Sequence, residues 1–367
     1  MKRLITLLIV VLCSSTCYGQ SSEKAANKQV DAFIEGKMKA LKIPGMAVAV
    51  IRNGQRVKVS TYGMANLEWN AKVTPHTNFQ IASCTKLLTS TLLLKAIHSQ
   101  KIQLEDYVSK YLPDAPAAWR TLQIKHLISH SSGIRNFNGD AYLPTAAVLR
   151  ALQDSTLEYA PGQGQHYAQF DFMTLGYILE KLYNKPFPQL LHDEVAAPLG
   201  MTDGAFDMEQ RVGTFMRTDL VKEKASTYYD LNGKLQAYKF IYPQYTYTAG
   251  GYFASIDDMA KWAVALDKET LFPASFASSY IYGLDSIGRK PSEFTRVGWA
   301  LERENNVLYA GHSGGPGLGD VWRFPKEGYT FIVLSNDGEL LPNFARAIAG
   351  FYIKELPAKT DIEKFER

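Results

Sequence analysis

Phe79-Gln80-Ile81-Ala82-Ser83-Cys84-Thr85-Lys86 leads into a long apolar segment of the chain. From Ser83 to about Gln100 the sequence is typical of a helix. Its apolar positions are Leu87, Leu88, Leu92, Leu93, Leu94 and Ile97. Because these positions cover much of the helix circumference, we predict a helix that is buried in the middle of the molecule.

Ser83 and Lys86 stand three residues apart at the start of this helix. Side chains at that spacing lie on one face, with about 5–6 Å between their Cβ atoms, so a lysine held neutral by desolvation can take the proton of the serine. The helix N-terminus beside Ser83 also favours developing negative charge. The same Ser-x-x-Lys pattern occurs from Ser21 to Lys24, and a plain N-cap serine remains the alternative to a nucleophile.

Two hairpins are predicted on either side of this region. The apolar run Met46–Ile51 is followed by Asn53-Gly54 and then by alternating valines. Asn-Gly between apolar runs indicates a hairpin because both residues accept positive φ. Residues 321–324 and 329–334 predict a second hairpin near the other end of the chain. We therefore expect an α+β fold, with one antiparallel sheet built from both chain ends, flanked by helices, and an inserted helical domain.

Two further helices and a division into domains follow from the remaining pattern. Ser255 with Asp258 is typical of a helix N-cap and predicts a helix to about Leu266. Pro342 fits the first turn of a closing helix that runs to about Leu356. The predicted domains are a signal peptide (1–19), a discontinuous sheet domain (20–90 and 205–357), an inserted helical domain (91–204) and a tail (358–367).

The first residues predict a signal for export. A basic start, Met1-Lys2-Arg3, precedes the apolar run 4–12 and a polar stretch of small residues, with cleavage expected after Gly19. The run is shorter than the ~20 apolar residues that span a bilayer, although a retained anchor is the alternative. Neither Cys13 nor Cys17 has the neighbours of a lipid-modified cysteine. We predict a periplasmic or secreted protein with no stable membrane span after cleavage.

Charge and cysteine usage exclude several classes of protein. The chain has 367 residues with 40 Lys+Arg, 36 Asp+Glu and a net charge of +4 that is spread along the sequence. Nucleic-acid-binding proteins gather their basic residues, so no nucleic-acid partner is expected. After signal cleavage Cys84 remains of the three cysteines, which leaves no intrachain disulfide. We expect a buried thiol that points away from Ser83 and Lys86, because adjacent helix positions point about 100° apart.

Two other motifs suggest a different chemistry and fail on their context. Gly311-His312-Ser313-Gly314-Gly315 matches the nucleophile elbow of α/β-hydrolases, but that fold needs a later histidine and none follows Ser313. His126 and His130 have the spacing of a zinc helix, but Leu127 stands where a metalloprotease has Glu and no third ligand is evident. We therefore predict structural histidines and no metal.

Three segments follow one another along the chain: Phe79–Lys86, then Pro161-Gly162 with Tyr167-Ala168-Gln169, and then His312-Ser313-Gly314. In this order they resemble the motifs of the serine β-lactamase and penicillin-binding-protein superfamily, in its class C β-lactamase-related branch. The resemblance spans the chain from about Val30 to Tyr352. Phe79–Lys86 is similar to the nucleophile motif of that superfamily. Pro161-Gly162 with Tyr167-Ala168-Gln169 is similar to the second motif, normally Tyr-x-Asn. The third, His312-Ser313-Gly314, is Lys-Thr-Gly in typical class C β-lactamases and His-x-Gly in many peptidases and esterases.

The resemblance implies an acyl-enzyme mechanism that needs no cofactor or metal. Ser83 would be the acylated nucleophile, Lys86 its activating partner, and Tyr167 the group that shuttles the proton to the leaving group. For Tyr167 a core aromatic residue is the alternative. The backbone N–H groups of Ser83 and Gly315 would form the oxyanion hole. The residues implied to bind a small-molecule or peptide substrate are Gln169, His312, Ser313 and Gly314.

Two departures from the motifs of this superfamily bear on the substrate. Gln169 keeps the amide of the usual Asn but adds one methylene, and His312 replaces the lysine that holds the β-lactam carboxylate. We therefore expect peptide, amide or ester substrates, as in D-Ala-D-Ala-type carboxypeptidases, D-amino-acid amidases and carboxylesterases. A β-lactamase remains an alternative, and so does a non-catalytic homologue that binds peptidoglycan peptides or another ligand. The oligomeric state is not predicted.

Overall fold

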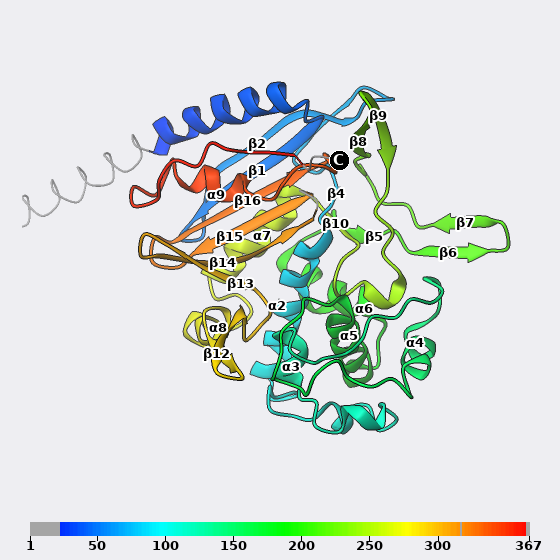
Figure 1. Ribbon diagram of the computed structural model, residues 1–367. Helices are drawn as coiled ribbons and strands as arrows, with labels where there is room; N and C mark the ends of the chain where they lie inside the picture. The colour runs from blue at the N-terminus through cyan, green and yellow to red at the C-terminus, as the bar shows by residue number, and fades with distance from the viewer. Residues whose placement is uncertain (1–22, 316–317, 365–367) are drawn as a thin grey trace, which may run out of the picture.

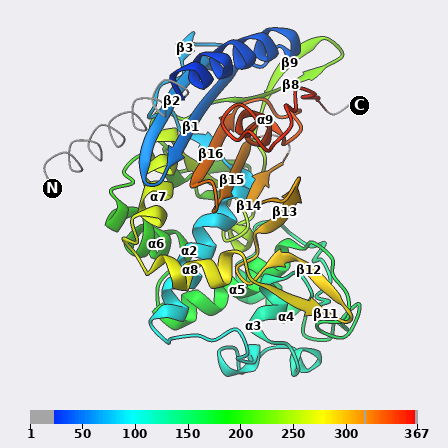
Figure 2. The same ribbon diagram turned by 90° about the vertical axis from the view of Figure 1, so that its left-hand side faces the viewer.

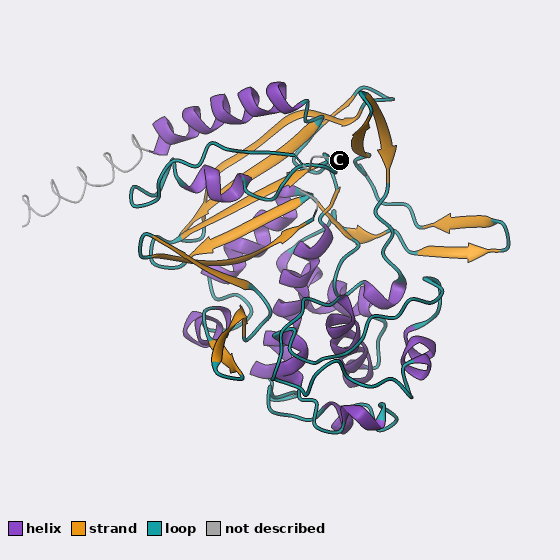
Figure 3. Ribbon diagram, viewed as in Figure 1, coloured by secondary structure: helices purple, strands orange, loops and turns teal. Residues whose placement is uncertain are grey.

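The computed structural model describes residues 23–315 and 318–364, and its main element is an antiparallel sheet of nine strands (Figures 1 and 3). In their order across the sheet, the strands are β11 (Leu284–Ile287), β12 (Lys290–Thr295), β13 (Ala300–Glu304), β14 (Val307–Gly314), β15 (Gly319–Phe324), β16 (Tyr329–Ser335), β1 (Gly45–Arg52), β2 (Gln55–Asn66) and β3 (Ala71–Lys72). Because β1 pairs with β16, strands from both parts of the chain meet inside one sheet, as predicted.

Helices lie on both sides of this sheet and fill the middle of the chain. They are a helix over 23–41, α2 (Thr85–His98), α3 (Ile124–Ile128), α4 (Thr145–Ala151), α5 (Gln169–Tyr183), α6 (Phe187–Leu191), α7 (Ile256–Asp267), α8 (Ala274–Ile281) and α9 (Phe344–Ala349). Figure 1 shows the N-terminal helix above the sheet and α2 to α6 gathered below it.

Short strands form three smaller sheets next to the main one. The strands are β4 (Phe79–Gln80), β10 (Tyr252–Ala254) and β5 (Ala205–Phe206) in the first, β6 (Glu209–Val212) and β7 (Phe215–Thr218) in the second, and β8 (Thr227–Leu231) and β9 (Lys234–Tyr238) in the third. The first of these sheets supports the segment before Ser83, because the N–H of Ile81 also bonds to the carbonyl of Tyr252 at 3.0 Å.

Strand β1 shows how the sheet separates two cores. The strand is buried along nearly its whole length, and successive side chains point to opposite faces. Ala47, Ala49 and Ile51 belong to the core that β1 shares with α2 and α7. Met46 and Val48 belong to a second core, shared with the N-terminal helix and α9. A strand covered on both faces reads as a continuous apolar run, which is the pattern of this sequence.

Both predicted hairpins are confirmed. Asn53 and Gly54 join β1 to β2 with φ values of 47° and 72°, and a two-residue turn of this kind needs positive values at both positions. Strands β15 and β16 pair in antiparallel register, with Phe324 opposite Tyr329. Strands that follow one another in these two segments are therefore antiparallel neighbours in the sheet.

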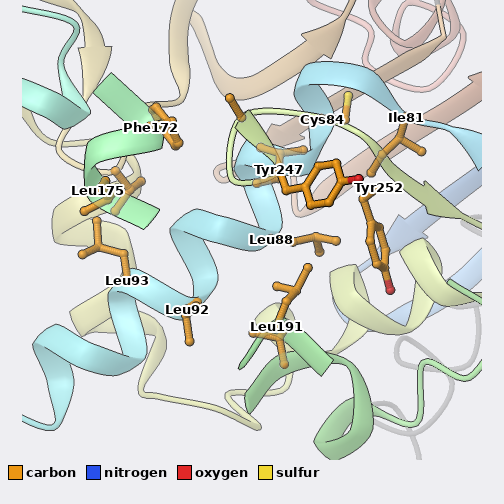
Figure 4. Packing of buried hydrophobic residues seen from close by; sticks show 14 of the residues in the cluster. Ile81, Cys84, Leu88, Leu92, Leu93, Phe172, Leu175, Leu191, Tyr247 and Tyr252 are labelled. Carbon is orange, nitrogen blue, oxygen red and sulfur yellow. The ribbon is translucent and has the colours of Figure 1, made fainter. Parts of the chain in front are cut away.

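Helix α2 is buried along most of its length, as its apolar pattern predicts. Figure 4 shows Leu88 and Leu92 among side chains that come from several other elements of the same core. A buried hydroxyl of the helix is bonded as well, since Ser90 Oγ donates to the carbonyl of Val297 at 2.5 Å. These contacts fasten α2 within the core.

The closing helix is shorter than predicted. Helix α9 covers Phe344–Ala349, so Pro342 precedes the helix instead of lying in its first turn, and the helix ends before Leu356. The buried carboxylate of Asp320 accepts a hydrogen bond from the N–H of Ala345 at 2.8 Å, and this contact fixes where the helix begins. Beyond the helix the backbone continues in single turns bonded to the third residue back.

The domain limits stay a prediction. Between α2 and β5 the described chain forms helices and turns, and the signal peptide predicted for 1–19 lies outside the described residues. The tail predicted from 358 is described as far as 364 and buries Ile362. Within the described ranges, no helix has the length and apolar character needed to cross a membrane.

Ser255 caps α7 as predicted, which makes it a direct test of how the sequence specifies this helix. Its Oγ accepts a hydrogen bond from the N–H of Asp258 at 3.0 Å and donates to Asp203 at 2.7 Å. Ser255→Ala removes both bonds, so we expect the free energy of unfolding to fall by about 1–2 kcal/mol. Urea denaturation measures this change. The matched control Ser286→Ala, at an exposed strand position, should stay within about 0.5 kcal/mol of wild type.

Candidate active site

Ser83 lies in a tight turn between β4 and α2. The turn is a 3-10 helix over Ala82–Cys84, and Ala82 has a φ of 47°. A residue other than glycine at positive φ is under strain and persists where its surroundings hold it. Here the end of β14 packs against the turn. A Cβ atom on Gly314 would lie 2.1 Å from the carbonyl oxygen of Ile81, so only glycine allows this approach.

Two side chains that are distant from each other in the sequence bond to the Ser83 hydroxyl. Tyr167 donates its phenolic hydrogen to Ser83 Oγ over 2.9 Å. Lys86 Nζ lies 3.3 Å from the same oxygen. The structure thus brings together the three residues for which the sequence implied a catalytic role, with both candidate proton carriers in contact with the candidate nucleophile.

Lys86 is fully buried, and its contacts come from oxygen atoms and aromatic rings. Nζ donates to the carbonyl of Ala249 at 2.8 Å. It lies 4.9 Å from the ring centroid of Tyr167 and 5.3 Å from that of Phe172. Within the described part of the chain, no carboxylate lies within 4.0 Å of this nitrogen. The amine is therefore held by neutral groups, with Ser83 Oγ among its hydrogen-bond partners.

A buried histidine and aspartate support Tyr167 from behind. The ring of His130 packs against Tyr167 with 4.5 Å between ring centroids, and His130 Nδ1 lies 3.0 Å from a carboxylate oxygen of Asp171. Burial raises the pKa of Asp171 well above its usual range. Burial, and then the charge of Lys86, hold the pKa of His130 well below its usual range. Burial thus favours the neutral form of each member of the pair.

This pair was not predicted as part of the site. The sequence pattern offers His130 only as a metal ligand or a structural residue, and it assigns no role to Asp171. One feature of the sequence could have indicated this pair. An ionisable residue, Asp171, lies between Phe170 and Phe172 in an otherwise apolar stretch of α5. A buried carboxylate needs a hydrogen-bonding partner, and Ser132 Oγ also donates to Asp171.

His312 is buried on β14 and faces the same group of residues. Its Nδ1–H donates to the carbonyl of Ser313 at 2.7 Å, and its ring centroid lies 6.0 Å from that of Tyr167. Burial, followed by the charge of Lys86, lowers the pKa of His312 to about 3. Because Nδ1 carries the proton, Nε2 presents a lone pair. In the described ranges this buried nitrogen has no hydrogen-bond partner.

The hydroxyl of Ser313 is already engaged. Its Oγ donates to Asp320 at 2.7 Å, and the same carboxylate accepts from Trp322 Nε1. Burial raises the pKa of Asp320. Ser313 lies inside strand β14 instead of at a strand-to-helix turn, which agrees with the exclusion of the nucleophile elbow. Because its hydrogen is donated to Asp320, the hydroxyl oxygen of Ser313 can interact with a substrate only as a hydrogen-bond acceptor.

Gly315 and Gln169 are placed near the site but without a contact that defines a role. Gly315 follows the end of β14 and is exposed. Gln169 is the first residue of α5 and is half-buried. Among the described residues, none forms a hydrogen bond with its side-chain amide. Their predicted roles in the oxyanion hole and in substrate binding therefore stay predictions.

Cys84 is buried beside the candidate nucleophile, as predicted. Its Sγ donates to the carbonyl of His312 at 3.2 Å. Burial raises the pKa of this thiol well above its usual range, so the residue stays a thiol and is a poor nucleophile. Its function is to fasten the turn of Ser83 to β14.

The two histidines with zinc-helix spacing are held by other contacts. His126 Nδ1 accepts a hydrogen bond from the N–H of Gln123, and burial lowers the pKa of His126 to about 4. In the described ranges, the group of side chains spaced for a metal ion lies elsewhere and consists of His76, Asp203 and Asp257. Asp257 in that group is already paired with Arg56 and Lys261.

Comparison with known proteins places the chain in context. A family model described as Beta-lactamase matches residues 30–350. Protein flp of Staphylococcus aureus (strain MW2) is 25% identical over 336 residues, which cover 86% of this chain and 64% of that protein. The chain therefore spans less than two thirds of the length of this relative.

Solved structures show the same fold. The octameric penicillin-binding protein homologue from Pyrococcus abyssi has a TM-score of 0.69 at 24% identity, covering 84% of this chain and 73% of its own. The D-amino acid amidase from Ochrobactrum anthropi SV3, solved with D-phenylalanine, has a TM-score of 0.72 at 18% identity. The match covers 89% of this chain and 98% of the amidase chain. At these identities the likeness establishes the fold.

The pKa of His312 predicts a specific dependence of stability on pH. Native His312 stays neutral down to about pH 3, whereas an unfolded histidine titrates near 6.5. Below pH 6.5 the unfolded state therefore binds one more proton, and the contribution of His312 to stability is lost as the pH falls. We compare wild type with His312→Gln by urea unfolding. As the pH rises from 4 to 6.5, the free energy of unfolding of wild type should increase relative to that of the variant by up to about 1.4 kcal/mol per pH unit. Above pH 6.5 the difference between the two should stay constant.

The control for this experiment is His98→Gln, which changes an exposed histidine at the end of α2. Asp171 and Asp320 also titrate in wild type, but they are present in both variants, so the difference isolates the histidine. A difference between wild type and His312→Gln that is the same at every pH would contradict the assignment of a neutral, buried imidazole.

Proposed function

The chain belongs to the Beta-lactamase family, whose model matches residues 30–350, and on this basis we propose that it is an exported serine hydrolase that forms an acyl-enzyme on Ser83. One observation carries the proposal. Ser83 Oγ is contacted by Tyr167 at 2.9 Å and by Lys86 at 3.3 Å. A hydroxyl at the start of a buried helix, with two proton carriers in direct contact, is the arrangement that nucleophilic catalysis needs.

The proposed reaction proceeds in two steps that reuse the same residues. Ser83 Oγ attacks the carbonyl carbon of the substrate and gives up its proton to Lys86, while the carbonyl oxygen gains the negative charge. Tyr167 delivers a proton to the leaving amine or alcohol as the bond to it breaks, which leaves an acyl ester on Ser83. Water then attacks the ester, and its proton returns through the same groups to the serine.

The oxyanion is assigned to the backbone N–H groups of Ser83 and Gly315. Each such donor lowers the barrier by about 3–4 kcal/mol. The support is positional: Gly314 packs against the turn of Ser83, so the next residue of the chain leaves β14 beside that turn. The positive end of the α2 dipole lies at the same place and favours negative charge there.

His312 supports a peptide or amide substrate over a β-lactam that is held by its carboxylate. The lysine found here in typical class C β-lactamases is a cation that attracts the carboxylate of a β-lactam. His312 is neutral at physiological pH because burial lowers its pKa to about 3, and its free Nε2 is an acceptor. An acceptor at this position suits a substrate that presents an N–H group, such as a peptide or an amino-acid amide.

Labelling tests whether Ser83 is the nucleophile. Incubation with a fluorophosphonate, followed by mass spectrometry of the digested protein, should place one adduct on the peptide that contains Ser83. Ser83→Ala should abolish the adduct. The matched control is Cys84→Ser, which changes the neighbouring buried residue and should retain labelling, because the Cys84 thiol is buried and bonded to the carbonyl of His312. No adduct with any acylating probe would instead support a ligand-binding homologue without catalysis.

A substrate panel tests the reaction class. Purified protein is assayed with p-nitrophenyl esters, D-Ala-D-Ala peptides, D-amino-acid amides and nitrocefin. We expect turnover in the ester or amide group and, with nitrocefin, a kcat/KM at least about a hundredfold lower, since one mispositioned contact costs about that much. Rapid nitrocefin hydrolysis with inert esters and peptides would show a β-lactamase instead.

A further inference from the structure

Large apolar side chains are exposed on the β2–β3, β6–β7 and β8–β9 hairpins and in the loops that follow β7 and β9. They are Leu67, Trp69, Val212, Phe215, Met216, Leu220, Leu231, Leu235 and Ile241, and we call this set the hairpin surface. Beyond this set, the large apolar side chains exposed in the described ranges are Tyr107 and Tyr167. A gathering of this kind marks an interaction site more often than scattered exposed residues do.

The hairpins that carry this surface are joined to one another. The turn after β2 contacts β8, because the N–H of Leu67 donates to the hydroxyl of Tyr228 at 2.8 Å. The end of β9 is linked to β6 by an ion pair between Lys239 and Glu209. Figure 1 shows β6–β7 and β8–β9 projecting on the right-hand side of the molecule. The three hairpins are thus neighbours in the structure.

The β6–β7 hairpin is the least covered part of it. Val212 lies opposite Phe215 at its end. Alternate residues of a strand face opposite sides, yet every residue from Phe215 to Thr218 is exposed, so neither face of β7 is covered. Arg211 ties the hairpin to the body through Asp140. A two-stranded hairpin has marginal stability alone in water, and one with apolar residues at its tip gains from a partner that covers them.

The charge of the region favours an anionic partner. The three hairpins and the loops that join them, residues 66–72 and 209–241, contain more basic than acidic side chains: Lys72, Arg211, Arg217, Lys222, Lys224, Lys234 and Lys239 against Glu68, Glu209, Asp219, Glu223 and Asp230. Within the described ranges, Arg217, Lys222 and Lys234 have no carboxylate within 4.0 Å. A symmetric contact between two copies would bring these like charges together, which is unfavourable. Apolar tips combined with free cations match an anionic lipid surface instead.

We propose that the hairpin surface docks the protein on a bilayer that contains anionic lipids. Phe215, Met216 and Leu220 enter the boundary between headgroups and acyl chains. Trp69 lies at the level of the headgroups, where tryptophan is enriched. The free lysines contact lipid phosphates. This proposal does not depend on the proposed catalysis. The hairpin surface is nevertheless connected to the candidate active site. The side chain of Gln80, three residues before Ser83, donates to the carbonyl of Phe240, just beyond β9, at 2.8 Å.

Co-sedimentation with vesicles tests the proposal. The full chain is mixed at about 0.15 M ionic strength with vesicles of phosphatidylcholine containing about 30% phosphatidylglycerol, and separately with pure phosphatidylcholine. We expect binding to the anionic vesicles and at least about tenfold weaker binding to the neutral ones. The double variant Phe215→Ser, Leu220→Ser should lose at least about tenfold in partition to anionic vesicles, because it removes the two most exposed apolar side chains of residues 212–220.

Controls separate this surface from other causes. Tyr107→Ser changes an exposed aromatic residue outside the hairpin surface and should bind like wild type. The apolar run 4–12 is the same in every variant, so the difference between variants reports the hairpins. The midpoint of urea unfolding should be the same in all of them, which shows that they are folded.

Three results would overturn the proposal. The first is a wild type that does not bind anionic vesicles. The second is a double variant that binds them as wild type does. The third comes from light scattering: a concentration-dependent oligomer that the double variant dissolves, without lipid binding, would identify a second copy as the occupant. Two further results would support the combined apolar and electrostatic contact. High salt should abolish the binding of wild type to anionic vesicles, and Lys222→Gln should retain part of that binding at about 0.15 M ionic strength.

Discussion

The contact between the end of β14 and the first turn of α2 is the constraint on which the site depends. Gly314 lets the strand backbone approach the carbonyl of Ile81, and Cys84 bonds its thiol to the carbonyl of His312. The strand belongs to the sheet, and the helix fills the core beneath it. Ser83 therefore lies where these two rigid elements meet, in a strained turn that neither element would hold alone.

Burial then decides the chemical character of the site. The pKa of His312 and of His130 is lowered and that of Asp171 is raised, so all three groups favour their neutral forms. Lys86 meets the serine hydroxyl, a carbonyl and two aromatic rings. Among the described residues, Lys86 and Tyr167 thus both contact Ser83 Oγ, with no carboxylate within 4.0 Å of the lysine nitrogen. This environment suits acyl transfer, and it disfavours the recognition of an anionic substrate through His312.

Much of this arrangement could be predicted from the sequence because it is local. The Asn53-Gly54 hairpin, the buried helix after Ser83 and the cap at Ser255 each follow from residues a few positions apart. Tyr167 was assigned through the family resemblance, since one tyrosine among 21 carries no signal alone. The contact of Asp171 with His130 was missed because it joins residues 41 positions apart. The closing helix was drawn too long because the carboxylate that fixes its start, Asp320, lies on β15.

The central claim is that Ser83, Lys86 and Tyr167 form one preassembled unit on which the acyl-enzyme is built. A crystal structure of the protein after reaction with a fluorophosphonate tests it most directly. The account predicts electron density continuous with Ser83 Oγ, with Lys86 Nζ and Tyr167 Oη still within hydrogen-bonding distance of that oxygen. Phosphorus bonded to another side chain, or a Tyr167 ring turned away from Ser83, would contradict it.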